Sequence, residues 1–429
     1  MSDRYLGTLS INRAVSDKTV LAPKNIGVDL THVLRGADNG GAKTFSLGLL
    51  LELCRQQESV NFIVYIKPEM ELEIKKIRNR PKNLKAITVA SGLEDVGSFK
   101  KAWKMVSNHI PKPIREFLIP LSRLIVGLDN FLLDPERQPS IDLMFYPFSR
   151  PDFNYSKSVP SVSVIYDLQH KFFPQNFAHG EIVLRDSTLE LIEKRSDKVI
   201  CISEFSLSTV KQHTNIASPR LTCVHIKMSG RLKVGSVKKG SRFESLFDTK
   251  YFIFPANFWP HKNHDLLLIA FLIARNNGLD SKIKLVLSGS LIGREKYFED
   301  LIDGLGLNDD VLLVGYVEDD VFSLLLKNAH ALVYPSFFEG FGMPVLEAMS
   351  LGVPVVCSEV TSLPEVAKNA ALYFDPRKPQ EIAEALIRIT LEEELRAELI
   401  DRGFANSAEF SKTDEMAKEY WKVFESCLK

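Results

Sequence analysis

ALVYPSFFEGFGMPVLEAMSLGVPVV, residues 331–356, passes from a short apolar run through a glycine-containing loop into a segment of helical period. Pro344 falls in the first turn of the expected helix, where its missing N–H is tolerated, and Gly352 falls just past the end of that helix. Short apolar runs followed by helical segments are typical of a parallel sheet covered by helices on both faces. The stretch therefore predicts an α/β fold.

The same alternation extends outward over both halves of the chain. Strands are expected at residues 25–30, 62–66, 86–90, 143–146, 162–166 and 198–202, and again at 251–255, 284–287, 311–314, 331–334 and 353–356. Helices are expected at residues 42–57, 100–108, 180–195, 204–213, 263–275, 294–305, 321–327 and 344–350, and residues 379–427 are almost wholly helical in period. This order predicts doubly wound sheets, which bind ligands at the carboxyl ends of their strands.

The length of the chain predicts two domains. Its 429 residues exceed what one hydrophobic core usually serves. Residues 227–247 are basic, rich in glycine and serine, and without periodicity, as expected of a linker. We expect a first domain at residues 20–226, a second domain at 248–407, and a final helix at 408–429 that can return to the first domain.

Composition excludes several classes of function. Lys plus Arg and Asp plus Glu number 54 each, so no overall positive charge attracts nucleic acid, and an anionic ligand needs a local site. The five cysteines are widely spaced and form no CxxC pair, which argues against a disulfide framework or a zinc cluster. The polar start MSDRYLGTLSINR lacks the apolar segment of a signal peptide, so we expect a cytoplasmic protein.

A basic segment precedes the longest apolar run of the first half. That run, residues 117–133, contains Pro120, Arg123 and Asp129 and falls short of the roughly 20 apolar residues of a membrane span. The segment before it carries Lys100, Lys101, Trp103, Lys104, Lys112 and Arg115. Two interpretations stay open: a solvated helix face packed on its own domain, and a peripheral contact with the inner face of a membrane.

The loop FFEGFG predicts an anion site. Gly340 and Gly342 let the loop expose its amides, and the helix that follows contributes unpaired N–H groups and the positive end of its dipole. Glu339 and Glu347 flank the site, and a carboxylate accepts hydrogen bonds from sugar hydroxyls. The arrangement suggests a ligand with both a phosphate and a polyol. A chance combination of a glycine turn, a surface glutamate and a helical glutamate is the alternative.

A second loop, FPANFWPHKNH, follows the expected strand at residues 251–255. Lys262 stands at the beginning of the next helix, where an ammonium group and helix amides can share a phosphate, although a solvated lysine is the ordinary alternative. His261 and His264 have no third metal ligand near them in sequence. Because the chain has no Asp-X-Asp pair, we expect protein cations, and no metal, to neutralise a bound diphosphate.

With these motifs the chain resembles glycosyltransferase family 4, also called group 1, whose members are retaining enzymes of GT-B fold. The resemblance is strongest over residues 251–375, through YFIFPANFWPHKN, LVLSGS, VLLVGYVEDD and the stretch quoted first. It is looser over GADNGGAKTFSLGLLLEL, SVSVIYDLQHKFFP and SDKVICISEFS. The resemblance implies two Rossmann-like domains that face each other across a cleft, the first on the acceptor side and the second binding a nucleotide sugar.

The resemblance also assigns roles in the second domain. It implies that Glu339 faces the donor sugar, that Glu347 faces the nucleotide ribose, and that Lys262 binds the diphosphate. Many members carry an arginine where this chain has Asn257, so either His261 or another cation compensates, or the phosphate charge is balanced differently. The donor-binding residues expected from the resemblance are Gly40, Gly41, Asn257, His261, Lys262, Glu339, Gly340, Phe341, Gly342, Met343 and Glu347.

In the first domain, the resemblance places the amides of Gly40 and Gly41 near the donor phosphate. Many members have His-Asp at the end of a strand where this chain has Tyr166 and Asp167, with His170 three residues further on. Which of these three meets the reacting sugar stays open. The catalytic residues expected from the resemblance are Glu339, Lys262, Asp167 and His170. Ser203 and Glu204 fit a helix cap better than a catalytic pair.

The resulting prediction is a retaining transferase that moves a mannose-type or glucose-type hexose from a nucleotide-diphosphate sugar to a glycan or lipid-linked acceptor. A non-catalytic GT-B binding protein, an inverting transferase and a sugar-nucleotide epimerase are alternatives. A P-loop hydrolase is a weaker one, because in GADNGGAKT, residues 36–44, Ala42 separates Gly41 from Lys43 where a phosphate loop needs them adjacent.

Overall fold

The computed structural model describes residues 24–33, 40–77, 79–89, 139–148, 150–154, 156–232, 234–235 and 243–428. The helix expected at residues 100–108, the basic segment at 100–115, the apolar run at 117–133 and positions 36–39 of the P-loop-like segment lie outside these residues. None of the described helices is long and apolar enough to cross a membrane.

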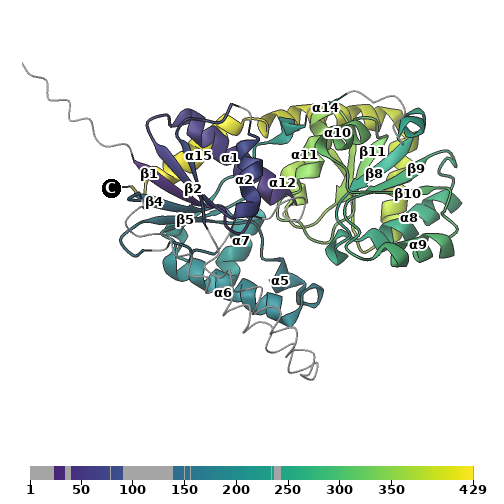
Figure 1. Ribbon diagram of the computed structural model, residues 1–429. Coiled ribbons are helices and arrows are strands. Elements are labelled where there is room, and N and C mark those ends of the chain that lie inside the picture. Colours follow the sequence, from purple (N-terminus) through teal and green to yellow (C-terminus); the bar gives the residue numbers. More distant parts are fainter. Residues whose placement is uncertain are drawn as a thin grey trace, which may run out of the picture.

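Two parallel sheets form the framework of the molecule (Figure 1). The seven-stranded sheet has the order β3-β2-β1-β4-β5-β6-β7, and the six-stranded sheet has the order β10-β9-β8-β11-β12-β13. The strands of the first sheet are β1 (Asn25–Asp29), β2 (Asn61–Ile66), β3 (Leu84–Thr88), β4 (Leu143–Tyr146), β5 (Ser161–Ile165), β6 (Lys198–Cys201) and β7 (Leu221–Cys223). Those of the second are β8 (Tyr251–Pro255), β9 (Lys284–Ser288), β10 (Val311–Gly315), β11 (Ala331–Tyr334), β12 (Val355–Ser358) and β13 (Ala371–Phe374). The predicted α/β fold with two parallel sheets is confirmed.

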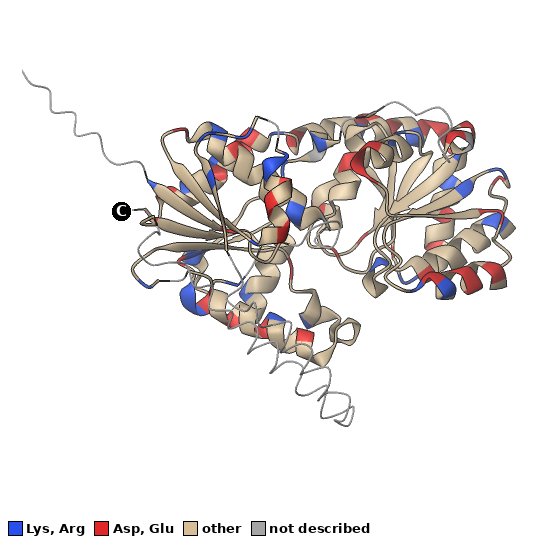
Figure 2. Ribbon diagram, in the orientation of Figure 1, with Lys and Arg blue, Asp and Glu red and all other residues tan. Residues whose placement is uncertain are grey.

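The strands form because their side chains are apolar on both faces. All five residues of β5 and all four of β12 are buried, as expected for strands covered by helices on each side. Charged residues accordingly lie mostly on the helices and loops (Figure 2). The sequence pattern missed β7 and β13, which are only three and four residues long and partly exposed. It also placed two strands about two residues away from β3 and β12.

Helices connect and cover the strands. They are α1 (Gly40–Gln56), α2 (Glu71–Lys75), α5 (Gln169–Phe172), α6 (His179–Arg195), α7 (Glu204–His213), α8 (His264–Asn276), α9 (Glu295–Gly304), α10 (Asp319–Lys327), α11 (Met343–Ser350), α12 (Leu363–Ala367), α13 (Pro379–Leu391), α14 (Glu393–Glu409) and α15 (Thr413–Glu425). The helical stretch expected at residues 379–427 is thus three helices. The short helices α2, α5 and α12 were not expected, because a helix of four or five residues leaves little periodic signal.

The last helix, α15, packs on the first domain, beside α1 (Figure 1). The ring of Tyr420 lies 6.1 Å from that of Phe45, and the ring of Phe424 lies 4.9 Å from that of Phe145. Lys227, which follows β7, adds an ion pair of 2.6 Å with Glu419. The chain therefore crosses between the two domains twice, once after β7 and once before α15.

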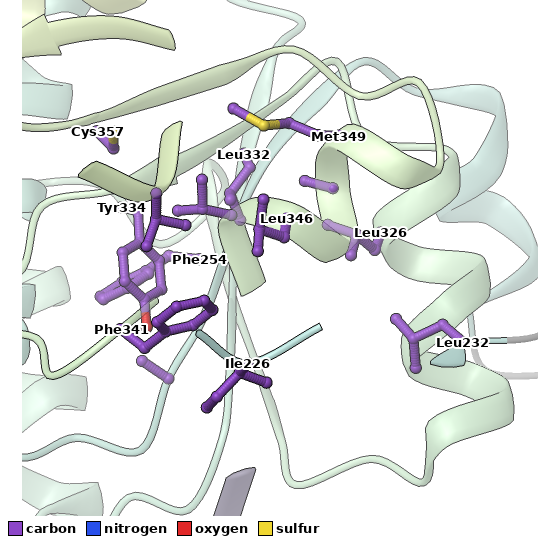
Figure 3. Close-up of a cluster of buried hydrophobic side chains, with 14 of the residues drawn as sticks. Ile226, Leu232, Phe254, Leu326, Leu332, Tyr334, Phe341, Leu346, Met349 and Cys357 are labelled. Carbon is purple, nitrogen blue, oxygen red and sulfur yellow. The ribbon is translucent and has the colours of Figure 1, made fainter. Parts of the chain in front are cut away.

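The segment after β7 is anchored where it reaches the second domain. Ile226 and Leu232 are buried in the same apolar cluster as Phe341 and Leu346, which lie on the loop before α11 and on α11 itself (Figure 3). A short 3-10 turn, η5 (Ser229–Arg231), lies between the two anchors and packs against α11. This part of the connection has a fixed position relative to α11.

Candidate active site

A cleft of about 1300 Å³ lies between the two domains, where strands of both sheets end. Of the residues that the sequence predicts for the site, those that line this cleft are Gly41, Asp167, His170, Asn257, His261, Lys262, Glu339, Gly340, Phe341, Gly342, Met343 and Glu347. Gly40 begins α1 next to Gly41. The tertiary structure therefore brings the predicted residues of both domains to one place, at the position where doubly wound sheets bind ligands.

The loop between β11 and α11, residues 337–342, is shaped by its glycines. Gly342 has φ 100°, in the left-handed region, and a Cβ there would lie 2.6 Å from Leu363 Cδ2. A Cβ on Gly340 would lie 2.7 Å from the carbonyl oxygen of Tyr166 in the first domain. The side chain of Phe341 is buried in the core, so this residue presents only its backbone to the cleft. Glycine is required here because the loop passes directly against the other domain.

Two helices begin at the cleft and face each other. A Cβ on Gly41, near the start of α1, would lie 3.2 Å from Sδ of Met343, the first residue of α11. The positive ends of both helix dipoles favour an anion between them. Lys43 on α1 forms an ion pair with Glu73. These helix starts support the anion site that the sequence predicts.

Lys262 and Glu339 form an ion pair in the cleft. The Nζ of Lys262 lies 2.6 Å from Oε1 of Glu339 and 3.4 Å from the hydroxyl of Tyr334 at the end of β11. Asn263 fixes the backbone after Lys262, because its side-chain amide donates to the carbonyls of Pro335 and Pro376 at 3.0 and 2.9 Å. One ammonium group and one carboxylate are therefore held together beside the start of α11.

Glu347 is paired with an arginine that the sequence did not single out. Its side chain is 2% exposed, and Nε of Arg231 donates to Oε1 at 2.6 Å. Nη1 of Arg231 also donates to Asp319 on α10 at 3.0 Å. Burial raises the pKa of Glu347, and the charge and hydrogen bond of Arg231 act in the opposite direction. Arg231 lies on η5, in the connection between the domains.

The two histidines near Lys262 are held neutral. His264 is 1% exposed and stacks on Phe258, with ring centroids 3.9 Å apart, and burial lowers its pKa to about 3. Burial also lowers the pKa of His261 to about 2, with a further contribution from the charge of Lys262. Both imidazoles are therefore neutral without a ligand, and a role of His261 in balancing a bound phosphate stays a prediction. The Oδ1 of Asn257 accepts a hydrogen bond from the N–H of Ser290 at 2.8 Å.

The first domain contributes Asp167 and His170. Oδ1 of Asp167 accepts the N–H of Gln169 at 2.9 Å, which orients the carboxylate at the end of β5. Nε2 of His170 lies 2.9 Å from Oδ1 of Asp186, burial lowers the pKa of His170, and its Nδ1 has no partner among the described residues. The hydroxyl of Tyr166 donates to the carbonyl of Pro147 at 2.7 Å, within the first domain. The side chains of Asp167 and His170 are therefore better placed than the Tyr166 hydroxyl to meet a ligand.

The second domain matches a known family. Residues 238–405 match the model of the family described as glycosyl transferases group 1. This part of the chain is therefore similar to the group 1 glycosyltransferases. This match covers the loop at residues 337–342, Lys262, Glu339 and Glu347.

Several curated proteins resemble the glycosyltransferase over a larger part of its length. O-antigen chain mannosyltransferase B of Escherichia coli is 27% identical over 289 residues, which are 65% of this chain and 75% of that protein. O-antigen chain mannosyltransferase RfbU of Salmonella typhimurium is 27% identical over 215 residues, which are 49% of this chain and 56% of that protein. The predicted enzyme class, a nucleotide-sugar-dependent glycosyltransferase, is confirmed.

Solved structures establish the fold. Anabaena HepE, crystallised with UDP and glucose, has a TM-score of 0.66 at 14% identity, covering 94% of this chain and 100% of HepE. WaaG, a glycosyltransferase involved in lipopolysaccharide biosynthesis, has a TM-score of 0.62 at 15% identity, covering 92% of this chain and 98% of WaaG. The glycosyltransferase therefore has the GT-B fold that its sequence predicts.

Among the described residues, polar contacts at the start of α7 join the domains of the glycosyltransferase beside the cleft. Ser203 caps α7 by accepting the N–H of Ser206 at 3.0 Å, as expected from the sequence, and it also donates to the carbonyl of Gly340 at 2.8 Å. Glu365 on α12 accepts the N–H groups of Glu204 and Phe205, at 2.7 and 3.0 Å, at the start of α7. The carboxylate at the start of α12 thus holds the start of a helix in the other domain.

Glu365 belongs to a group of three residues with the chemistry of metal ligands. One ligand atom each of Cys223, His225 and Glu365 lie within 4.8 Å of one another. Nε2 of His225 lies 2.5 Å from Oε1 of Glu365, whose carboxylate already accepts the two α7 amides. These hydrogen bonds account for the proximity of the group, and we interpret it as an interdomain contact. Neither Arg231 nor Glu365 has a local sequence signal, because Glu347 lies 116 residues from Arg231 and Glu204 lies 161 residues from Glu365 in the chain.

Proposed function

We propose that the protein is a retaining glycosyltransferase of family 4 that transfers a mannose-type or glucose-type hexose from a nucleoside-diphosphate sugar to a glycan or lipid-linked saccharide. The observation that carries the proposal is the ion pair of Lys262 and Glu339 beside the start of α11, opposite the start of α1. It combines a cation and helix amides for a diphosphate with a carboxylate for sugar hydroxyls. A nucleotide sugar has both groups.

In this proposal, Lys262 has two partners in turn. Without a donor, its ammonium group is balanced by Glu339, with side chains only 16% and 10% exposed. When a donor binds, the diphosphate forms an ion pair with the ammonium group of Lys262, and Glu339 accepts hydrogen bonds from the hydroxyls of the sugar. Because these two side chains are largely shielded from water, their interactions are stronger than they would be at the surface.

The transfer step develops negative charge on the departing diphosphate while the sugar becomes oxocarbenium-like. Lys262 and the amides of residues 340–342 stabilise this charge. Hydrogen-bond donors that are already in place stabilise a transition state most where charge develops during the reaction. For a retained configuration, we propose that the acceptor hydroxyl attacks from the face that the diphosphate leaves and gives its proton to a leaving phosphate oxygen. Asp167 and His170 line the opposite wall of the cleft and are proposed to orient the sugar and the acceptor.

The relatives support the proposed type of sugar and acceptor. Both curated relatives described above are O-antigen chain mannosyltransferases, which favours mannose and a polysaccharide acceptor. HepE was crystallised with UDP and glucose, which keeps a UDP-linked glucose open as a donor. Contact with a membrane through the basic segment at residues 100–115 stays a prediction, since these residues are outside the described structure. Independence from metal also stays a prediction, which transfer in the presence of a chelator would test.

The test is a donor panel followed by product analysis. We expect one of GDP-mannose and UDP-glucose to raise the melting temperature of the full chain, and release of its nucleoside diphosphate to depend on an added glycan acceptor. The product should have the same anomeric configuration as the donor, as read by NMR. Binding without transfer would favour the non-catalytic alternative. A product with the opposite anomeric configuration would favour an inverting enzyme. Conversion of the sugar nucleotide to another one in the absence of an acceptor would favour an epimerase.

A further inference from the structure

The cation nearest to Glu347 comes from the connection between the domains. Arg231 donates from Nε to Oε1 of Glu347 at 2.6 Å and from Nη1 to Asp319 at 3.0 Å. Its own side chain is 18% exposed and lines the cleft. Leu232 follows Arg231 directly, and Ile226 lies five residues before Arg231. Both side chains are buried in the core around α11 (Figure 3). The guanidinium is therefore presented to Glu347 from an anchored backbone.

A carboxylate as buried as that of Glu347 needs a partner. Removing an ionised carboxylate from water costs several kcal/mol unless a charge and hydrogen bonds compensate. Among the described residues, Arg231 is the cation that favours the ionised form of Glu347, whereas the nearby carboxylate of Asp319 opposes it. Only Oε1 of Glu347 is engaged by Arg231, and Oε2 accepts no hydrogen bond from the described residues.

We propose that Arg231 is a positioning residue for the nucleotide: it binds one carboxylate oxygen of Glu347 and so leaves the other to accept the ribose hydroxyls of a nucleoside diphosphate. The inference rests on the proposed function, because it needs a nucleotide in the cleft. It also gives the segment between the domains a role in donor recognition. Arg231 acts through Glu347, so the two residues form one unit.

The experiment measures binding of UDP and GDP to the full chain by calorimetry, with inorganic pyrophosphate as a probe that lacks the ribose. For the nucleotide that binds the unmodified protein, Arg231→Met is expected to weaken binding on the order of tenfold or more, because Glu347 loses its charged partner. Glu347→Gln should weaken it by a similar factor. The double variant should bind no more weakly than the weaker single variant, and pyrophosphate binding should stay unchanged in all three.

Two further variants separate positioning from a general effect on the fold. Arg231→Lys retains a charge and should recover part of the affinity that Arg231→Met loses. Lys227→Met makes the matched change in the same segment, where Lys227 pairs with Glu419 on α15 and does not line the cleft, and it should bind nucleotide normally. If Arg231→Met does not fold, Arg231→Lys and Glu347→Gln are compared with their double variant in the same way.

Four results would overturn the proposal. The first is an unchanged nucleotide affinity in Arg231→Met, and the second is a loss of pyrophosphate affinity in that variant equal to its loss of nucleotide affinity. The third is a double variant whose fold-loss of nucleotide affinity is the product of the two single fold-losses, and the fourth is an equal loss of nucleotide affinity in Lys227→Met. The second result would assign Arg231 to the phosphates directly, and the last would mean that any ion pair of this segment matters. A cleft that takes no nucleotide is distinct from all four, because the unmodified protein would then bind neither UDP nor GDP. A protein that binds a nucleotide but transfers no sugar would refute the proposed function and leave the positioning role of Arg231 intact.

Discussion

The hydroxyl of Ser203 in the first domain donates a hydrogen bond of 2.8 Å to the carbonyl oxygen of Gly340 in the second. The same hydroxyl accepts the N–H of Ser206 and so caps α7. The residue that starts a helix in one domain therefore also holds the loop that carries Glu339 in the other. Ser203 is buried and Gly340 is partly buried, so the hydrogen bond is costly to lose.

Replacing Ser203 by alanine is expected to affect stability and transfer together. The loss of the cap should lower the free energy of unfolding by about 1 kcal/mol. The carbonyl of Gly340 loses a donor at the same time, so kcat/KM for transfer should fall severalfold. Urea denaturation and steady-state rates measure the two effects. Ser208→Ala, on the exposed face of α7, is the control, and an equal loss of rate there would contradict the role of Ser203.

Replacing Gly340 by alanine should separate the loop from the first domain. Its Cβ would lie 2.7 Å from the carbonyl oxygen of Tyr166, a distance at which the backbone must shift. Displacing catalytic groups by about 1 Å can reduce the rate about 100-fold, so we expect a loss of that order in kcat while the protein remains folded. Gly304→Ala, at the end of α9 with no atom within 4 Å of its Cβ, should keep full activity. Normal activity of Gly340→Ala would show that the interdomain contact is dispensable.

Lys262→Ala and Glu339→Ala are each expected to reduce transfer by about 100-fold to 1000-fold, a loss typical of removing a group that stabilises the transition state. The matched control is Lys296→Ala. Lys296 also lies 2.6 Å from a carboxylate, that of Asp300, but its side chain is 84% exposed, and its removal should leave the rate unchanged. Rates with saturating donor decide the outcome, and near-normal transfer in either cleft variant would refute this site.

The stability of the protein should fall below neutral pH because of His264. Its pKa is about 3 in the folded chain and about 6.5 when unfolded, so between these values the unfolded state binds a proton that the folded state does not. The free energy of unfolding should therefore decrease by about 2 kcal/mol from pH 7 to pH 5 on account of this residue. Urea denaturation should show a smaller pH dependence in His264→Gln than in the unmodified protein. His179→Gln, at an exposed position, should retain the full dependence, and equal slopes in all three would contradict the assignment.

Much of the fold was predictable because its signals are local. Buried strands such as β5 and β12 are continuous apolar runs, and the loop before α11 is marked by Gly340 and Gly342 on one side and Pro344 on the other. A parallel sheet places the ends of these strands along one edge, so residues that follow strands were expected to meet. The confirmed group 1 match and GT-B fold rest on this pattern.

What the sequence alone determined is thus the succession of strands and helices and the residue types after certain strands, including Lys262, Glu339 and Glu347. The tertiary structure decided which charges are paired. Arg231 and Glu347 are 116 residues apart, and Ser203 and Gly340 are 137 apart, so no local periodicity relates them. Only the packing of η5 and α7 against the second domain brings these groups together, because partners for buried polar atoms are selected by the folded arrangement of the domains.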